Sequence, residues 1–264
     1  MKAQEHIQAA RLDEALATLQ DEVRNNAADA KLRTFLFQLL CVMGNWPRAL
    51  TQLDVLGGFD PDHKLLANIF RPVVQCEMLR AEVFAGKCTP IVFGEPQEWM
   101  GLLVQANEML AKGKSGPAQE LRDKAFETAP ATSGKINDQP FEWIADSDPR
   151  LGPMLEVIVE GHYYWIPFCR IKRMFIEAPT DLRDLVWTPA QFTWSNGGEA
   201  SGHIPTRYPG TERAGDNLLR LARKTEWVEG APDFSTGLGQ RTLATDAAEI
   251  ALLECRTIEM TDGQ

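Results

Sequence analysis

The sequence contains no run of basic residues and no apolar run long enough to cross a membrane. Its 264 residues include 27 Lys and Arg against 37 Asp and Glu, which gives a formal net charge of −10. Nucleic-acid binding needs a surplus of Lys and Arg on some face. A membrane helix needs roughly 18 consecutive apolar residues, and the opening stretch MKAQEHIQAA lacks the apolar segment of a secretory signal. We therefore expect a cytoplasmic protein that binds neither nucleic acid nor membrane.

Cysteine and histidine, two common metal ligands, are scarce and scattered. The five cysteines are odd in number and form no CxxC pair, which favours reduced thiols over a disulfide framework or a zinc site. The four histidines are His6, His63, His162 and His203. None stands in HxxH, HExxH or HxH spacing, and His162 is expected at a hairpin turn. The sequence therefore predicts no metal site and no cofactor.

The first third of the chain contains an internal repeat of helical character. RLDEALATLQ, from Arg11, aligns with NWPRALTQLD, from Asn45, and the offset of 34 residues (45 − 11) is the tetratricopeptide period. Between them, DAKLRTFLFQLLCVMG places apolar residues at helical spacing. Pro72 predicts a kink or a break in the next helix, and TPIVFGEPQEW interrupts the period. Further helices are predicted at Glu98–Ala111 and Pro117–Thr128.

The second half of the chain changes to short strands. LEVIVEGHYYWIPF and QFTWSNGGEASGHIP each predict a hairpin, and RMFIEAP, LARKTEWVE, QRTLATD and EIALLECRTIEM predict further strands. The stretch APATSGKINDQP is rich in small and turn-forming residues, so it is the expected boundary. We predict an α+β fold of two domains. Residues 1–130 form a tetratricopeptide-like α-α superhelix, and residues 131–264 form a smaller, mostly antiparallel β-rich domain.

Motifs that would carry catalysis are incomplete. GLGQR, from Gly237 to Arg241, has two glycines of a dinucleotide loop but follows no strand of a βαβ unit. Ser195, in TWSNG, shares only a final glycine with the GxSxG nucleophile elbow. No phosphate-binding lysine loop is present. The sequence therefore predicts no catalytic residue and no cofactor-binding residue.

Two acidic stretches are compatible with either structure or chemistry. In ADSDPRLGP, Asp146 and Asp148 stand beside Arg150, with Glu142 just upstream. Their oxygens could hold Ca²⁺ or Mg²⁺, although the twelve-residue EF-hand pattern is absent. The favoured interpretation is a turn at the joint between the two domains, in which both aspartates pair with Arg150. In DLRDLVW, the charged residues are Asp181, Arg183 and Asp184. They could form a structural ion-pair knot, a docking patch or a catalytic pair.

Several longer motifs, in order along the chain, carry a resemblance to a known family. They are LRDKAFETAPATSG, FEWIADSDPRLGPMLEVIVEGHYYWIPF, APTDLRDLVWTPAQFTW, IPTRYPGTE, LARKTEW and GLGQR. They run from about Leu121 to Arg241, and the match extends more loosely through the helical repeat. The sequence resembles the ImpE family, also called TagJ, an accessory component of the bacterial type VI secretion system.

The resemblance implies a setting rather than a reaction. Members of the family are cytoplasmic proteins with no known catalytic activity. They resemble an adaptor that binds the N-terminal helix of the small contractile-sheath subunit. That subunit is linked to the AAA+ unfoldase that recycles contracted sheaths, so the adaptor is expected to modulate sheath disassembly. The resemblance carries no catalytic residue over to this chain.

A layer of paired helices can receive an amphipathic helix with apolar anchors at i, i+3/i+4 and i+7. The predicted partner-binding residues are Phe35, Phe37, Gln38, Trp46, Arg48, Arg183, Asp184 and Trp187. Helix packing competes for the first five, so we expect about half of them to be exposed. One alternative is a metal-dependent hydrolase or other enzyme that uses Asp146, Asp148, Asp181 or His162. Another is a scaffold that binds a partner through its acidic C-terminal face.

Overall fold

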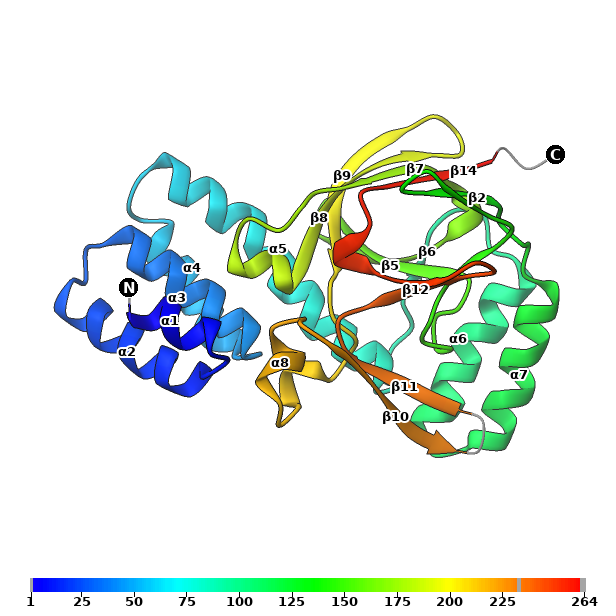
Figure 1. Cartoon of the computed structure of the whole chain (residues 1–264), viewed down its shortest axis with the longest axis horizontal. Helices are drawn as coiled ribbons and strands as arrows, with labels where there is room; N and C mark the ends of the chain where they lie inside the picture. Colours follow the sequence, from blue (N-terminus) through cyan, green and yellow to red (C-terminus); the bar gives the residue numbers. More distant parts are fainter. Residues whose placement is uncertain (1, 232–233, 262–264) are drawn as a thin grey trace.

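The structure, a computed structural model, describes residues 2–231 and 234–261. A helical region comes first and a mostly antiparallel β-rich region follows, as predicted (Figure 1). The long helices are α1 (Lys2–Gln8), α2 (Leu12–Asn25), α3 (Ala30–Val42), α4 (Trp46–Leu56), α5 (Pro61–Phe84), α6 (Glu98–Ala111) and α7 (Ser115–Thr128). Among the described residues, no helix is both long and apolar enough to cross a membrane.

The repeated segments form α2 and α4, and two of their matched pairs of residues are fully buried. Ala15 and Leu19 of α2, like Ala49 and Leu53 of α4, are 0% exposed. Helix α3 lies between them in sequence and begins at an N-cap, where the Asp29 carboxylate accepts hydrogen bonds from two backbone N–H groups. The helical spacing of apolar residues therefore predicted these elements correctly.

Helix α5 is continuous through Pro72, so of the predicted kink or break, the break is wrong. Proline removes one backbone hydrogen bond and clashes with the preceding turn. Here Val73 and Val74 are buried beside it, and the Pro72 ring lies against Gly161, where a Cβ atom would come within 2.9 Å of it. Tertiary packing therefore compensates for the lost bond. Figure 1 shows α5 running from the helical layer to the sheet.

A nine-stranded sheet forms the centre of the β-rich region. Its strands, in spatial order, are β1 (Ile91–Val92), β6 (His162–Pro167), β5 (Met154–Val159), β9 (Glu199–Pro205), β8 (Trp187–Trp194), β7 (Ile171–Ile176), β14 (Thr257–Met260), β2 (Gly134–Ile136) and β3 (Gln139–Phe141). All neighbours pair antiparallel except β1 and β6. Both predicted hairpins are confirmed, with pairs Val159 to His162 and Thr193 to Glu199 at their turns.

Two smaller sheets complete the β-rich region. One contains β13 (Glu249–Ala251), β12 (Thr242–Thr245) and β4 (Ile144–Asp146), and the other contains β10 (Thr225–Ala231) and β11 (Phe234–Gly239). Sequence patterns missed β4, whose three residues are too few to show periodicity. Because the change from helix to strand already occurs at Gly134, ADSDPRLGP connects β4 to β5. Its interpretation as a joint between domains is therefore wrong.

Two hydrophobic clusters cover the two faces of strands β5 and β6. The first joins the helices to one face, where the buried side chains are Met154, Ile158, Tyr163 and Trp165. The second lies between the large sheet and the three-stranded sheet and includes Leu155, Val157, Ile166 and Leu243. The first cluster thus contains side chains from both sides of residue 130, and the domain boundary there stays a prediction.

The GLGQR motif has a structural explanation in its glycines. A Cβ atom at Gly237 would overlap the ring of Tyr208, and its backbone N–H donates to the Asp148 carboxylate at 2.9 Å. Gly239 has φ +87°, in the region that favours glycine. Packing and backbone conformation therefore account for both glycines without a bound dinucleotide.

We expect Gly237→Ala to lower the free energy of unfolding by about 1–3 kcal/mol, since the Tyr208 ring must shift. The matched control is Gly116→Ala on exposed α7, where a Cβ meets nothing within 4 Å, so stability should be unchanged or rise by up to about 1 kcal/mol. Urea denaturation measures both. Wild-type stability in Gly237→Ala would contradict this account.

Candidate functional site

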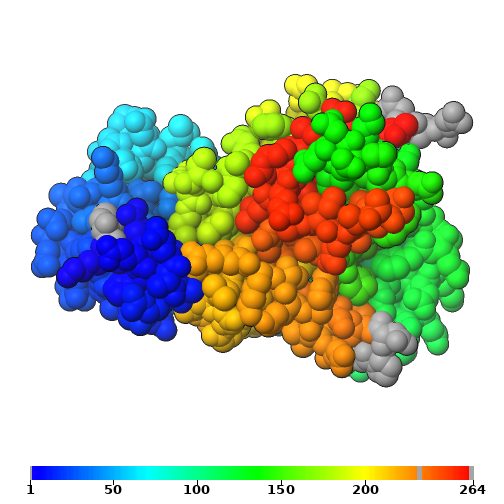
Figure 2. All heavy atoms as spheres, viewed as in Figure 1, coloured from blue at the N-terminus to red at the C-terminus, as the bar shows by residue number. Residues whose placement is uncertain are grey.

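A groove of about 890 Å³ lies between α1, α3 and the segment 179–185, which contains the short 3₁₀ helix η2 (Leu182–Leu185). We call it the helix groove. Its apolar lining is Ile7, Leu32, Phe35, Leu182 and Leu185. Figure 2 shows the yellow-green segment that contains η2 directly beside the blue and cyan helices. The groove is therefore composite, with one wall from the helical layer and one from the β-rich region.

Asp184 fixes the η2 wall of the helix groove. Its carboxylate accepts hydrogen bonds from the backbone N–H groups of Thr180 and Asp181, each at 2.8 Å. Arg183 pairs with Asp181 at 2.6 Å, and its guanidinium carbon lies 4.6 Å from the centre of the Phe70 ring. Asp184 is 4% exposed. Of the three interpretations of DLRDLVW, the structural ion-pair knot describes this arrangement.

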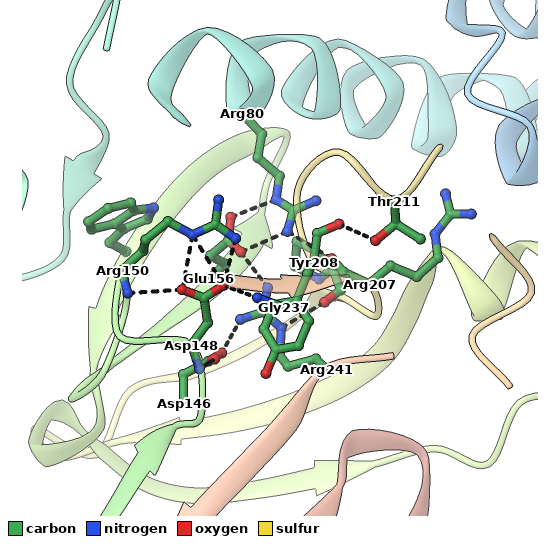
Figure 3. A network of polar contacts seen from close by, with 12 residues as sticks. Arg80, Asp146, Asp148, Arg150, Glu156, Arg207, Tyr208, Thr211, Gly237 and Arg241 are labelled. Carbon is green, nitrogen blue, oxygen red and sulfur yellow. Dashed lines mark hydrogen bonds and ion pairs between the residues drawn. The ribbon is translucent and has the colours of Figure 1, made fainter. Parts of the chain in front are cut away.

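A set of paired charges lies between α5 and the sheets (Figure 3). The buried charge network consists of Arg80, Arg150, Arg207 and Arg241 with Glu77, Asp146, Asp148 and Glu156. Both oxygens of Glu156 accept from Arg80, at 2.6 and 2.8 Å, and Glu156 also pairs with Arg241. Arg241 pairs in turn with Asp146. Three of the arginines thus pair with the four carboxylates, and Arg207 donates to backbone oxygens instead.

The network perturbs the acidity of its members in opposite directions. Burial opposes ionisation of Glu156, but Arg80 and Arg241 outweigh burial and lower its pKa to about 2. Burial raises the pKa of Asp146 to about 6, against the opposing effect of Arg241. Glu156 has two guanidinium partners and Asp146 has one, which accounts for the lower pKa of Glu156.

The acidic residues proposed for metal or acid/base chemistry are engaged with arginines. Asp148 pairs with Arg150 at 2.6 Å, as predicted. Asp146 does not pair with Arg150; it pairs with Arg241 and accepts from the backbone N–H of Asp148 at 2.8 Å, which corrects the prediction. Glu142 is exposed. Within residues 2–231 and 234–261, no three His, Cys, Asp or Glu side chains are grouped to hold a metal ion.

The predicted partner-binding residues separate into groove-lining and interior positions. Phe35 and Gln38 line the helix groove. Phe37 and Trp187 are 0% exposed, and Asp184 is also buried, so these three residues present almost no surface to a partner in this structure. Phe37 packs on Phe70, with ring centroids 5.9 Å apart.

The other three predicted residues lie outside the lining of the helix groove. Trp46 contacts Trp187, with ring centroids 5.9 Å apart, and Arg48 is exposed on α4. Arg183 belongs to η2, but its guanidinium lies over the Phe70 ring and does not line the groove. Leu182 and Leu185 also line the groove but were not predicted, although their spacing of three residues beside the predicted Arg183 and Asp184 was the available signal.

Comparisons with known proteins match this chain along nearly its whole length. The ImpE protein family matches residues 138–259. The chain is 48% identical over 259 residues to the "Type VI secretion system accessory component TagJ" of Pseudomonas aeruginosa, across 98% of this chain and 91% of that protein. The chain belongs to the ImpE family. A crystal structure of protein VPA1032 from Vibrio parahaemolyticus matches this ImpE chain with a TM-score of 0.91 and 25% identity, across 100% of this chain and 98% of the other.

The ImpE match contains most of the buried charge network. Asp146, Asp148, Glu156 and Arg241 all lie within residues 138–259, whereas Arg80 and Glu77 come from α5. The motifs ADSDPRLGP and GLGQR, which carried the resemblance, therefore meet in space through Asp146 and Arg241. The network is therefore formed mostly by the ImpE region, and α5 contributes the remaining two members.

We expect Glu156→Gln to lower the free energy of unfolding at pH 7 by about 3–5 kcal/mol, since two buried guanidiniums lose their shared carboxylate. The pKa of Glu156 is lowered from 4.5 to about 2, so its stabilising contribution is complete above pH 4.5 and is lost as the pH falls toward 2. The difference in free energy of unfolding between the wild type and Glu156→Gln should therefore shrink as the pH is lowered below about 4.5.

Guanidinium denaturation across this pH range measures the effect. The matched control is Glu259→Gln, which removes an exposed pair with Arg173 at 3.2 Å and should change stability by no more than about 1 kcal/mol at any pH. A deficit of Glu156→Gln that is small at pH 7, or that grows on acidification, would contradict the assigned role.

Proposed function

We propose that this ImpE-family chain is a non-enzymatic adaptor of a type VI secretion system. It binds the N-terminal helix of the small contractile-sheath subunit in the helix groove and so modulates sheath disassembly by the AAA+ unfoldase. The observation that carries the proposal is the composite apolar groove between α3 and η2. Family membership supplies the setting, since the Pseudomonas aeruginosa relative is named a type VI secretion accessory component.

The lining of the groove suits an amphipathic helix. Leu32 and Phe35 are three residues apart on α3, and Leu182 and Leu185 are three residues apart on η2. Two such apolar pairs can contact one apolar stripe at i, i+3/i+4 and i+7 spacing. All four side chains are partly buried, so each keeps apolar surface that a bound helix would cover.

The proposal is non-enzymatic because of how the acidic residues are used. A general acid or base must reach a substrate, but Asp146 and Asp148 are 3% and 0% exposed and hold arginines. His162 is exposed at the β5–β6 turn, where its ring nitrogen lies 3.0 Å from the backbone oxygen of Glu160. These contacts favour an adaptor over the hydrolase alternative.

We expect Phe35→Ala to weaken binding of a synthetic peptide of the sheath subunit's first helix by about tenfold, because an aromatic anchor is lost. Calorimetry on the full chain measures the affinity. The matched control is Phe175→Ala, which removes a phenylalanine that is 41% exposed on the outer face of the large sheet and should bind as the wild type does.

Two results would contradict the proposal. One is absence of binding between the wild-type chain and either the peptide or the intact sheath subunit. The other is equal loss of affinity in Phe35→Ala and Phe175→Ala, since the groove would then have no special part in binding. Thermal unfolding of each variant checks that both remain folded at the temperature of the measurement.

A further inference from the structure

Two polar side chains stand at the floor of the apolar helix groove. Gln38 is 6% exposed, and its carboxamide makes no hydrogen bond to any residue in the part of the chain that the structure describes. The Thr34 hydroxyl oxygen is buried and likewise has no partner among those residues. Both lie on α3, four residues apart, so they share one face of the helix.

Such groups are unusual because they are costly. Most buried polar side-chain atoms in folded proteins have a hydrogen-bond partner. Valine at position 34 would keep nearly the same shape without leaving a buried hydroxyl unsatisfied. The Gln38 carboxamide has no partner among the described residues and stays open to the groove, so a helix that covers it has to supply its hydrogen bonds. Nothing in the packing of α3 requires an amide there, since Phe37, Leu39 and Leu40 around it are fully buried apolar residues. The pair therefore indicates a partner that supplies the missing bonds.

We propose that Gln38 and Thr34 are specificity-determining residues that bind a carboxamide side chain, Asn or Gln, on the apolar face of the helix held in the groove. This inference rests on the proposed function. The backbone N–H and C=O groups within a bound helix are already paired with each other, so a side chain must supply the bonds. One polar residue in an apolar stripe also fixes the register of the bound helix.

The chemistry of the pair selects a carboxamide. Gln38 offers two N–H donors and one acceptor oxygen, and the Thr34 hydroxyl can donate or accept. A partner carboxamide has both kinds of group and can satisfy both residues. A carboxylate has only acceptors and an ammonium only donors, so each leaves one group unpaired and also buries a charge. A wholly apolar helix leaves both residues unsatisfied.

The first part of the test separates a binding role from a structural one. Thr34→Val should unfold at the same or higher denaturant concentration than the wild type, because it removes an unpaired buried hydroxyl. Gln38→Leu should not unfold at a lower concentration, because the Gln38 amide makes no hydrogen bond to the described residues. The matched control is Gln240→Leu. The Gln240 amide donates to the Ala222 oxygen at 2.7 Å and accepts from the Leu253 N–H at 3.1 Å, so this variant should be clearly less stable. Destabilisation by Gln38→Leu as large as that of Gln240→Leu would overturn the inference.

The second part measures affinity on the full chain, with the sheath-subunit peptide as the probe. Gln38→Leu should weaken binding by about tenfold. Replacing one particular Asn or Gln of the peptide by Leu should weaken binding to the wild type by a similar factor but have little further effect on Gln38→Leu, as a double-mutant cycle requires.

The outcomes distinguish this inference from the proposed function. Wild-type affinity in Gln38→Leu, or an apolar face of the peptide without Asn or Gln, overturns the inference and leaves the groove as the binding site. Failure of the wild-type chain to bind the peptide overturns the proposed function and the inference with it. Reduced affinity together with undiminished stability supports the assigned role of Gln38.

Discussion

The arrangement of this protein depends on Glu156, which is fully buried between Arg80 of α5 and Arg241, the residue directly before β12. A buried carboxylate without partners would cost several kcal/mol, and here two guanidiniums and the Tyr163 hydroxyl share it. The helical layer and the sheets are therefore connected by charge pairs that tolerate little displacement. Apolar packing alone would allow the two layers to slide, because it is not directional.

The contacts of the network extend to both walls of the helix groove. Arg80 donates to the backbone oxygen of Arg207 at 2.8 Å, and Arg207 donates to the oxygen of Val42 at the end of α3 at 2.8 Å. On the other side, Trp187 stands two residues after the end of η2, and its indole N–H donates to the Glu77 carboxylate at 3.0 Å. Both walls are thus anchored to one rigid centre. A groove held in this way is preorganised, which reduces the ordering cost of binding.

Sequence patterns could predict the features that depend on neighbours in the chain. The helix at 98–111 follows from the periodicity of its apolar residues, and the hairpins at β5–β6 and β8–β9 follow from their turn residues. The pairing of Asp146 with Arg241 could not be predicted, because 95 residues separate them and many arginines were available. The sequence also could not predict that Phe37 is buried while Phe35 is partly exposed. Apolar residues occupy most of the surface of α3, so their pattern does not indicate which face points outward.

Paired and unpaired polar groups in this interior have different physical meanings. The network contains seven buried charged side chains and the partly buried Arg150, which pair with one another or with backbone oxygens. Such an arrangement specifies one packing of the layers. The buried Thr34 hydroxyl and the mostly buried Gln38 side chain also lie on one helix, but neither has a hydrogen-bond partner among the described residues. Under the proposed function, a bound helix that covers both groups has to supply those bonds, which makes its affinity depend on its own polar side chains. Paired charges thus fix the packing of the layers, whereas these two polar groups, with no partner in the described chain, are the ones that we propose select the bound helix.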